Sequence, residues 1–303
     1  MNRFKWFLAV SMISVSVLLT GCSGKDKDVT PKVNYFVDGE KAEAAPDKNF
    51  YEAISIESNS KDASIVWDCE SWTMKFDNTT GKETVNVYFE YQSKPVTVDG
   101  IGFESLQEAL NYCGSGSKRV YLTKDVVGAG STAKGSDISI ELGGYSIEGN
   151  GEDTIINNGT MTIYGAGSIT NSVDGEYSKS IVNYGNLTLQ GVTVSNTTNS
   201  VTIWNSDNGS SVLTLKDSDI SHSVPTTMTI VNSGTMEIVS GSVTGCGDSF
   251  HPTVYNNKSE SVLTLTGGSI TNSSEGYSIY NESGTINYGS ATYGESYNMP
   301  AME

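Results

Sequence analysis

The feature that most constrains this chain is a short motif that recurs six times between residues 154 and 281. Each copy contains Ser or Thr, then Ile or Val, one variable residue and Asn, as in Thr154–Asn157. The six asparagines are Asn157, Asn183, Asn205, Asn232, Asn256 and Asn281. The steps between them are 26, 22, 27, 24 and 25 residues. A repeat of this length is typical of solenoid proteins, in which each repeat stacks on the next.

Each repeat has room for three short strands. A small turn follows the Asn and leads to a second run of alternating apolar and polar residues, such as Met161–Ile163. In five of the repeats a third run follows, as around Ile169. Alternation with period two predicts strands that bury one face. One repeat cannot bury its apolar residues alone, so we predict stacked repeats with neighbouring strands about 4.8 Å apart.

The asparagine column carries a resemblance to a known fold. An Asn at the same turn of every repeat can hydrogen-bond to the Asn above and below it, and Asn tolerates tight turns. The column resembles the asparagine ladder of right-handed parallel β-helices. Residues 119–289, including an irregular early repeat around Ile138–Leu142, are similar to the pectate-lyase-like superfold and to repeat-rich bacterial surface proteins. The resemblance implies an all-β, right-handed parallel β-helix of about six to seven rungs. It implies no single function, because this superfold hosts lyases, hydrolases, adhesins and phage spikes alike.

The first residues have the pattern of an export signal. Two basic residues, Arg3 and Lys5, precede an apolar run that is too short for an ordinary transmembrane helix. The run ends at Leu19–Cys22, which resembles the lipobox of bacterial lipoproteins, and this resemblance implies a lipid on Cys22 after cleavage. We therefore expect a signal peptide at 1–21, the lipidated Cys22 with a tether at 22–30, and a location on the outer side of a bacterial membrane. A simple secretory signal with an incidental Cys is the alternative.

Residues 31–95 have the pattern of a small β domain. Two alternating runs, Trp72–Phe76 and Val85–Tyr91, are separated by a turn at 78–81, and they predict a two-stranded unit with one buried face. Residues 290–303 are expected to form a C-terminal tail.

Residues 96–118 are expected to hold a linker and a short capping helix. Ser105 and Glu108 form a capping box, and the apolar positions Leu106, Ala109, Leu110 and Cys113 share one helical face. Such a helix can cover the open end of the β stack, where backbone groups are otherwise unpaired.

Charge and cysteine usage narrow the classes of partner. With 18 basic against 35 acidic residues the formal charge is −17, which argues against binding to nucleic acid.

The three cysteines after Cys22, namely Cys69, Cys113 and Cys246, are widely spaced and form no Cys-x-x-Cys or Cys/His cluster. We therefore expect no metal and no cofactor. Pairing of Cys69 with Cys113 stays open.

One group of carboxylates supports the hypothesis that the protein is an enzyme. Glycosidases need two carboxylates about 5–10 Å apart on one face. Asp217 and Asp219 are two positions apart and are expected to share a face, with His222 nearby and Asp207 on the preceding turn of the same rung. The competing interpretation is that these are solvated polar residues at outward positions.

A set of aromatic residues supports the leading hypothesis, which is that the protein binds a ligand without catalysis. The residue before each ladder Asn is expected to point outward, and in three rungs it is aromatic: Trp204, Tyr255 and Tyr280. Outward rings among Asn, Ser and Thr can stack on sugars, although cross-strand packing explains them too. We therefore expect a non-catalytic adhesion or glycan-binding module whose partner is an extracellular or host glycan or a surface protein. A polysaccharide lyase or glycoside hydrolase is the first alternative and a structural spacer the second.

Overall fold

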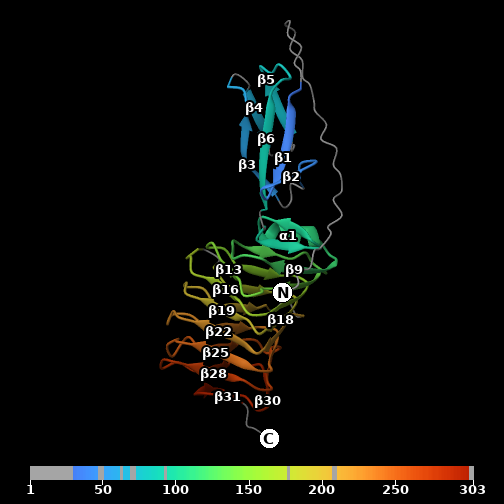
Figure 1. Cartoon of the computed structure of the whole chain (residues 1–303). Helices are drawn as coiled ribbons and strands as arrows, with labels where there is room; N and C mark the ends of the chain where they lie inside the picture. The colour runs from blue at the N-terminus through green and yellow to red at the C-terminus, as the bar shows by residue number, and fades with distance from the viewer. Residues whose placement is uncertain are drawn as a thin grey trace, which may run out of the picture. The chain divides into compact units, whose positions relative to one another are not determined.

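The structure is a computed structural model that describes residues 30–46, 51–61, 64–68, 73–91, 94–175, 178–206 and 210–299 (Figure 1). The chain divides into two compact units, residues Met1–Ser93 and Lys94–Glu303. The expected signal peptide, Cys22 and Cys69 lie outside the described residues. In the described part, no helix is long and apolar enough to cross a membrane.

The first unit contains a four-stranded sheet in the order β2-β1-β6-β3 and a separate pair, β4-β5. Its core is formed by Val85, Val87 and Phe89 on one face of β6. The strands are β1 (Lys32–Val37), β2 (Glu40–Ala42), β3 (Tyr51–Ser58), β4 (Ser64–Asp68), β5 (Thr73–Asp77) and β6 (Thr84–Tyr91).

The strand partners in this unit differ from those expected. The two alternating runs are strands β5 and β6, but they do not pair with each other. Strand β5 pairs with β4, whereas β6 lies between β1, to which it is parallel, and β3, to which it is antiparallel. Alternation specifies which face of a strand is buried, and it does not specify the neighbour that supplies the hydrogen bonds.

The second unit is a parallel β-helix of about seven turns, which confirms the predicted fold class (Figure 1). Each turn contributes one strand to each of three parallel sheets. The first sheet contains β9 (Ser117–Leu122), β12 (Asp137–Glu141), β15 (Thr160–Tyr164), β18 (Asn186–Gln190), β21 (Val212–Lys216), β24 (Thr235–Ile238), β27 (Val262–Leu265) and β30 (Thr285–Tyr288). The second contains β10 (Val126–Val127), β13 (Ser146–Glu148), β16 (Ser168–Asn171), β19 (Thr193–Asn196), β22 (Ser218–His222), β25 (Gly241–Gly245), β28 (Ser269–Asn272) and β31 (Thr292–Tyr293). The third contains β11 (Gly130–Ser131), β14 (Ile155–Asn157), β17 (Ile181–Asn183), β20 (Ile203–Asn205), β23 (Ile230–Asn232), β26 (Val254–Asn256), β29 (Ile279–Asn281) and β32 (Ser296–Tyr297).

Apolar side chains of equivalent register fill the inside of the β-helix. In the third sheet the inward aliphatic residues of successive strands lie directly above one another, from Ile155 on β14 to Ile279 on β29, and all are fully buried. These columns belong to one continuous hydrophobic core that runs through the unit. Stacking therefore buries what a single rung would leave exposed.

The six repeated asparagines form an unbroken hydrogen-bonded ladder at the end of the third sheet. Each Nδ2 donates to the Oδ1 of the Asn in the next rung, over 2.7 to 2.8 Å, from Asn157 to Asn281. The same amide groups also donate to backbone carbonyls, as Asn183 does to Val212 O at 3.0 Å. No ladder Asn is more than 3% exposed. The ladder thus satisfies buried polar groups at a turn that every rung shares.

A short helix covers the N-terminal end of the stack. Helix α1 (Leu106–Cys113) begins after Ser105, whose side chain accepts a hydrogen bond from Glu108 N. Its buried face is formed by Leu106, Ala109, Leu110 and Cys113, and the Cys113 thiol is free. Strands β7 (Val96–Val98) and β8 (Ile101–Phe103) extend the first sheet beyond β9. The first rung is therefore covered by both a helix and a hairpin.

The C-terminal end differs from the expected tail at 290–303. Strands β31 and β32 extend the second and third sheets. Asn298 donates to Asn281 O at 2.9 Å and accepts from Asn281 Nδ2 at 3.3 Å, so it continues the polar contacts of the ladder. The step from Asn281 to Asn298 is 17 residues, shorter than every earlier step, and this hides the last rung from a search for a 25-residue period.

Candidate functional site

The structure describes two of the three carboxylates of the enzyme hypothesis, and both are exposed on either side of the buried Ser218. Asp217 lies at the corner between β21 and β22 with φ 48°, a left-handed conformation that Asp tolerates. Asp219 is exposed on the outer face of β22, where it accepts a hydrogen bond from Ser242 Oγ at 2.6 Å. Asp207 lies outside the described residues.

His222 points into the core rather than towards Asp219. Residues alternate along β22, so exposed Asp219 and buried His222 lie on opposite faces. The His222 Nδ1 atom is 3.1 Å from Thr202 Oγ1, and its Nε2 atom is buried without a hydrogen-bond partner. Burial lowers the pKa of His222 to about 4, so the ring is neutral at pH 7. Among the described residues, no group of three or more His, Cys, Asp or Glu side chains is placed to hold a metal ion.

The aromatic residues do come together on the outer face of the third sheet. Trp204, Tyr255 and Tyr280 occupy one column, as the register pairs of strands β20, β23, β26 and β29 show, with Val231 between Trp204 and Tyr255. All three aromatic side chains are half-buried, whereas the residues on either side of them in the strand are buried. Tyr297 on β32 continues the column beyond Tyr280 and is 47% exposed. We call Trp204, Tyr255, Tyr280 and Tyr297, with the flanking Tyr184 and Tyr277, the aromatic strip.

The lower part of the aromatic strip is a connected cluster of four tyrosines. The Tyr280 ring stacks on Tyr297 at 4.6 Å between centroids and meets the edge of Tyr255 at 5.6 Å. Tyr277 lies 5.6 Å from Tyr297 and 6.2 Å from Tyr280. The Tyr255 hydroxyl donates to Glu282, and burial together with this bond raises the pKa of Tyr255 to about 12. Contacts within the cluster therefore cover part of the surface of these rings, and Tyr297 has the most exposed side chain of the four.

The upper part of the aromatic strip consists of Trp204 and its neighbours. The Lys179 ammonium lies 5.7 Å from the Trp204 ring centroid, and Lys179 also pairs with Asp153 at 3.5 Å. Tyr184 meets Trp204 with centroids 6.1 Å apart and planes inclined by 66°. Trp204 is thus held between a cation and a tyrosine, both of which limit its movement.

Sequence reasoning missed the three flanking aromatic residues for identifiable reasons. Tyr297 lies in the short last rung, which the period of the repeat does not reveal. Tyr184 follows a ladder Asn directly, and Tyr277 precedes the Ser of the motif, so neither occupies the outward position that the pattern singles out. A scan for aromatic residues within two positions of each motif would have found Tyr184 and Tyr277.

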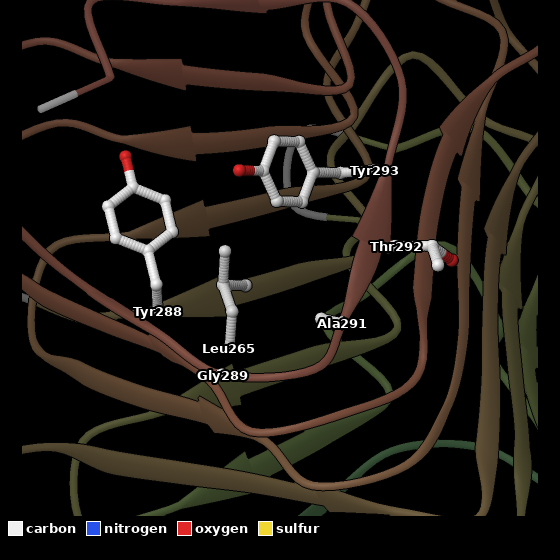
Figure 2. A pocket seen from close by; sticks show the side chains of 6 residues that line it. All are labelled: Leu265, Tyr288, Gly289, Ala291, Thr292 and Tyr293. Atoms are coloured by element: carbon white, nitrogen blue, oxygen red, sulfur yellow. The ribbon is translucent and has the colours of Figure 1, made fainter. Parts of the chain in front are cut away.

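A separate pocket of about 320 Å³ lies at the C-terminal end of the β-helix (Figure 2). Figure 2 shows the Leu265 side chain pointing into the space between the rings of Tyr288 and Tyr293. Burial and the neighbouring Tyr293 raise the pKa of Tyr288. The remaining lining residues are Gly289, Ala291 and Thr292. All belong to the last two rungs, so this pocket is the interior of the stack at the point where the stacking stops.

No protein-family profile, no curated protein and no solved structure matches this chain.

Proposed function

We propose that this chain is a lipid-anchored bacterial surface protein whose β-helix binds an extracellular glycan without cleaving it. The aromatic strip is the observation that carries the proposal. Elsewhere the outward positions of the strands are mostly Ser, Thr and Asn, as at Thr162, Thr188 and Thr214. Half-exposed rings on a surface that elsewhere is mostly hydroxyl and amide groups are suited to the apolar faces and hydroxyls of sugars.

The residues expected to carry binding are Trp204, Tyr255 and Tyr280, together with Tyr297. A surface protein is the alternative partner for the aromatic strip, since tyrosine and tryptophan are also enriched at protein interfaces. The asparagine ladder and the three parallel sheets support placing the fold with right-handed β-helices of the pectate-lyase-like superfold.

The glycan hypothesis is tested with the full chain, purified in mild detergent, on an array of neutral and anionic oligosaccharides. We expect stable capture of neutral glycans with no new reducing ends over time. The triple variant Trp204→Ala, Tyr255→Ala, Tyr280→Ala should lose capture, whereas Thr188→Ala on the first sheet should retain it. New reducing ends would contradict the non-catalytic proposal and redirect attention to Asp217 and Asp219. Failure to capture any glycan would overturn the proposal.

The membrane anchor rests on the resemblance of Leu19–Cys22 to a lipobox, and it has a test of its own. We expect the mature protein, produced in a bacterium that processes lipoproteins, to begin at Cys22 and to carry lipid on that residue. Mass spectrometry of the N-terminal peptide measures both. A mature chain that starts elsewhere, or an unmodified Cys22, would contradict the anchor.

A further inference from the structure

A second surface feature, outside the column of outward aromatic residues, is a groove of about 980 Å³ along the corner between the third and first sheets. It crosses four successive corners of the β-helix, from Thr132 to Ser210. At about 4.8 Å per rung, its length is about 14 Å. The volume lies at the upper end of the range of roughly 300–1,000 Å³ that is usual for ligand sites.

The groove results from the lengths of these corners. Two short corners, at 158–159 and 184–185, follow a longer one at 132–136. Each short corner contains a glycine, and a Cβ at Gly185 would collide with the carbonyl oxygen of Gly159. The floor of the groove is therefore low because two backbone turns stack directly on each other without side chains between them.

The groove offers neutral hydrogen-bonding groups and one aromatic ring. Asn158 donates both amide hydrogens within the protein, to Ser131 Oγ at 3.2 Å and to Thr132 O at 2.8 Å, so it offers a ligand its oxygen. Thr160 and Asn186 are exposed at the starts of β15 and β18. Tyr184 is half-buried in the groove wall, where Trp204 meets its ring. A saccharide site uses hydrogen-bond acceptors in fixed positions, exposed amide and hydroxyl groups, and an aromatic ring whose position is fixed by its neighbours. The groove contains all three.

The charge of the groove favours a neutral ligand. The whole chain has a formal charge of −17, yet the groove is lined by one basic and one acidic residue, Lys134 and Asp137. The Asp137 carboxylate already accepts a hydrogen bond from Ser117 Oγ at 3.0 Å. An anionic sugar would meet an acidic protein with only one lysine in the groove, whereas a neutral sugar meets no such repulsion.

We propose that this groove binds a neutral oligosaccharide, with a sugar ring on Tyr184 and its hydroxyls on Asn158, Thr160 and Asn186. The proposal rests on the glycan-binding function above and adds a site that the outward aromatic column does not include. Trp204, which is absent from the residues lining the groove, positions Tyr184 for this second site, while its own ring belongs to the outward aromatic column.

The test measures affinity of the full chain for neutral oligomers of glucose, xylose and mannose and for an oligomer of uronic acid. We expect Tyr184→Ala to weaken binding of the neutral oligomer about tenfold or more, and Tyr184→Phe to restore it, because the ring carries the contact. Asn186→Ala should also weaken binding. Thr160→Trp, at an exposed strand start, should block the groove without disturbing the fold. Tyr145→Ala, an exposed tyrosine at another corner, is the matched control.

The outcomes separate the two proposals. If the wild-type chain binds a neutral oligomer and the Tyr184, Asn186 and Thr160 variants bind equally well, the groove is overturned while the outward column of Trp204, Tyr255, Tyr280 and Tyr297 stands. If the wild-type chain binds none of these oligomers, the groove proposal is overturned, and the glycan array decides separately whether the proposed function stands. Tighter binding of the uronic acid oligomer than of the neutral ones would overturn the neutral specificity. Melting temperatures of all variants show that a loss of binding is not a loss of folding.

Discussion

His222 stands where the two preceding rungs have asparagine. In the second sheet it pairs in register with Asn196, and Asn196 pairs with Asn171. Asn196 donates to Ser178 O at 2.7 Å and accepts from Thr198 N at 2.7 Å, so its amide is used in both directions. The imidazole of His222 reaches Thr202 but leaves Nε2 buried without a partner. The exchange of Asn for His at this register thus places a titratable group in the core.

We predict that His222 makes the stability of the β-helix fall as the pH drops from about 6.5 to about 4. The folded pKa is about 4 and the ordinary value is 6.5, so over this range the unfolded chain takes up the proton and the folded chain resists it. The full loss corresponds to about 3 kcal/mol. Urea unfolding at pH 7 and pH 4.5 measures it, and His222→Asn should remove this part of the pH dependence.

The control for this prediction is His251→Asn. His251 lies on a loop and pairs with Asp248 at 2.7 Å, with about 29% of its side chain exposed. The carboxylates that titrate in the same range are common to all three proteins, so the comparison isolates His222. An unchanged slope in His222→Asn would contradict the prediction.

At the same scale, the candidate site could be predicted from the sequence only in part. The outward positions of Trp204, Tyr255 and Tyr280 follow from strand alternation around the repeated Asn. The left-handed conformation of Asp217 does not, because the repeat pattern does not show where a non-glycine residue will adopt it. Likewise, Tyr184 lines a groove whose existence depends on the lengths of corners in different rungs.

Among the elements, helix α1 depends on a close approach to the third sheet. Gly130 on β11 lies directly beneath it, and a Cβ there would be 2.7 Å from Leu106 Cδ2 and 2.9 Å from Leu110 Cδ1. Glycine at this position therefore lets the helix seat its apolar face on the first rung.

We predict that Gly130→Ala destabilises the packing of helix α1 on the first rung of the β-helix. The added methyl group has to displace Leu106 or Leu110, and such overpacking costs about 1–3 kcal/mol. Hydrogen exchange of residues 106–113 should speed up, and the urea midpoint should fall. Gly116→Ala is the matched control, because its Cβ would have only an ordinary contact, 3.4 Å from Cys113 O. Equal exchange rates in the two variants would show that the helix does not depend on this approach.

The elements themselves were largely predictable. The helix begins at its predicted cap, and the strands of the regular rungs follow from the period-two pattern inside a 25-residue repeat. Strand partners in the first unit were not predictable, since β5 and β6 both satisfy the same alternation and find different neighbours. The final rung was hidden by its shortened step, and there Tyr293 takes an inward position that is aliphatic in most earlier rungs.

For the whole molecule, the regular stacking has a mechanical consequence. Hydrogen bonds between rungs run along the axis of the β-helix, and each rung pairs only with its neighbours. Among the described residues, α1 and the β7-β8 hairpin cover the N-terminal rung, while β30, β31 and β32 are the last strands of their sheets. A pull on the C-terminus therefore loads one rung at a time rather than all rungs together.

Under tension the solenoid should act as a stepwise extensible tether. We predict that optical tweezers attached to the two ends of the chain will record successive lengthenings of about 8 nm, the contour length of one rung, starting from the C-terminal rung. The variant Asn232→Ala, which removes the ladder hydrogen bonds to both Asn205 and Asn256, should lower the force of two successive intermediate steps. A single rupture of the entire β-helix would contradict this picture. A protein built in this way could stay attached to a surface under shear, giving up length gradually while its remaining rungs keep their shape.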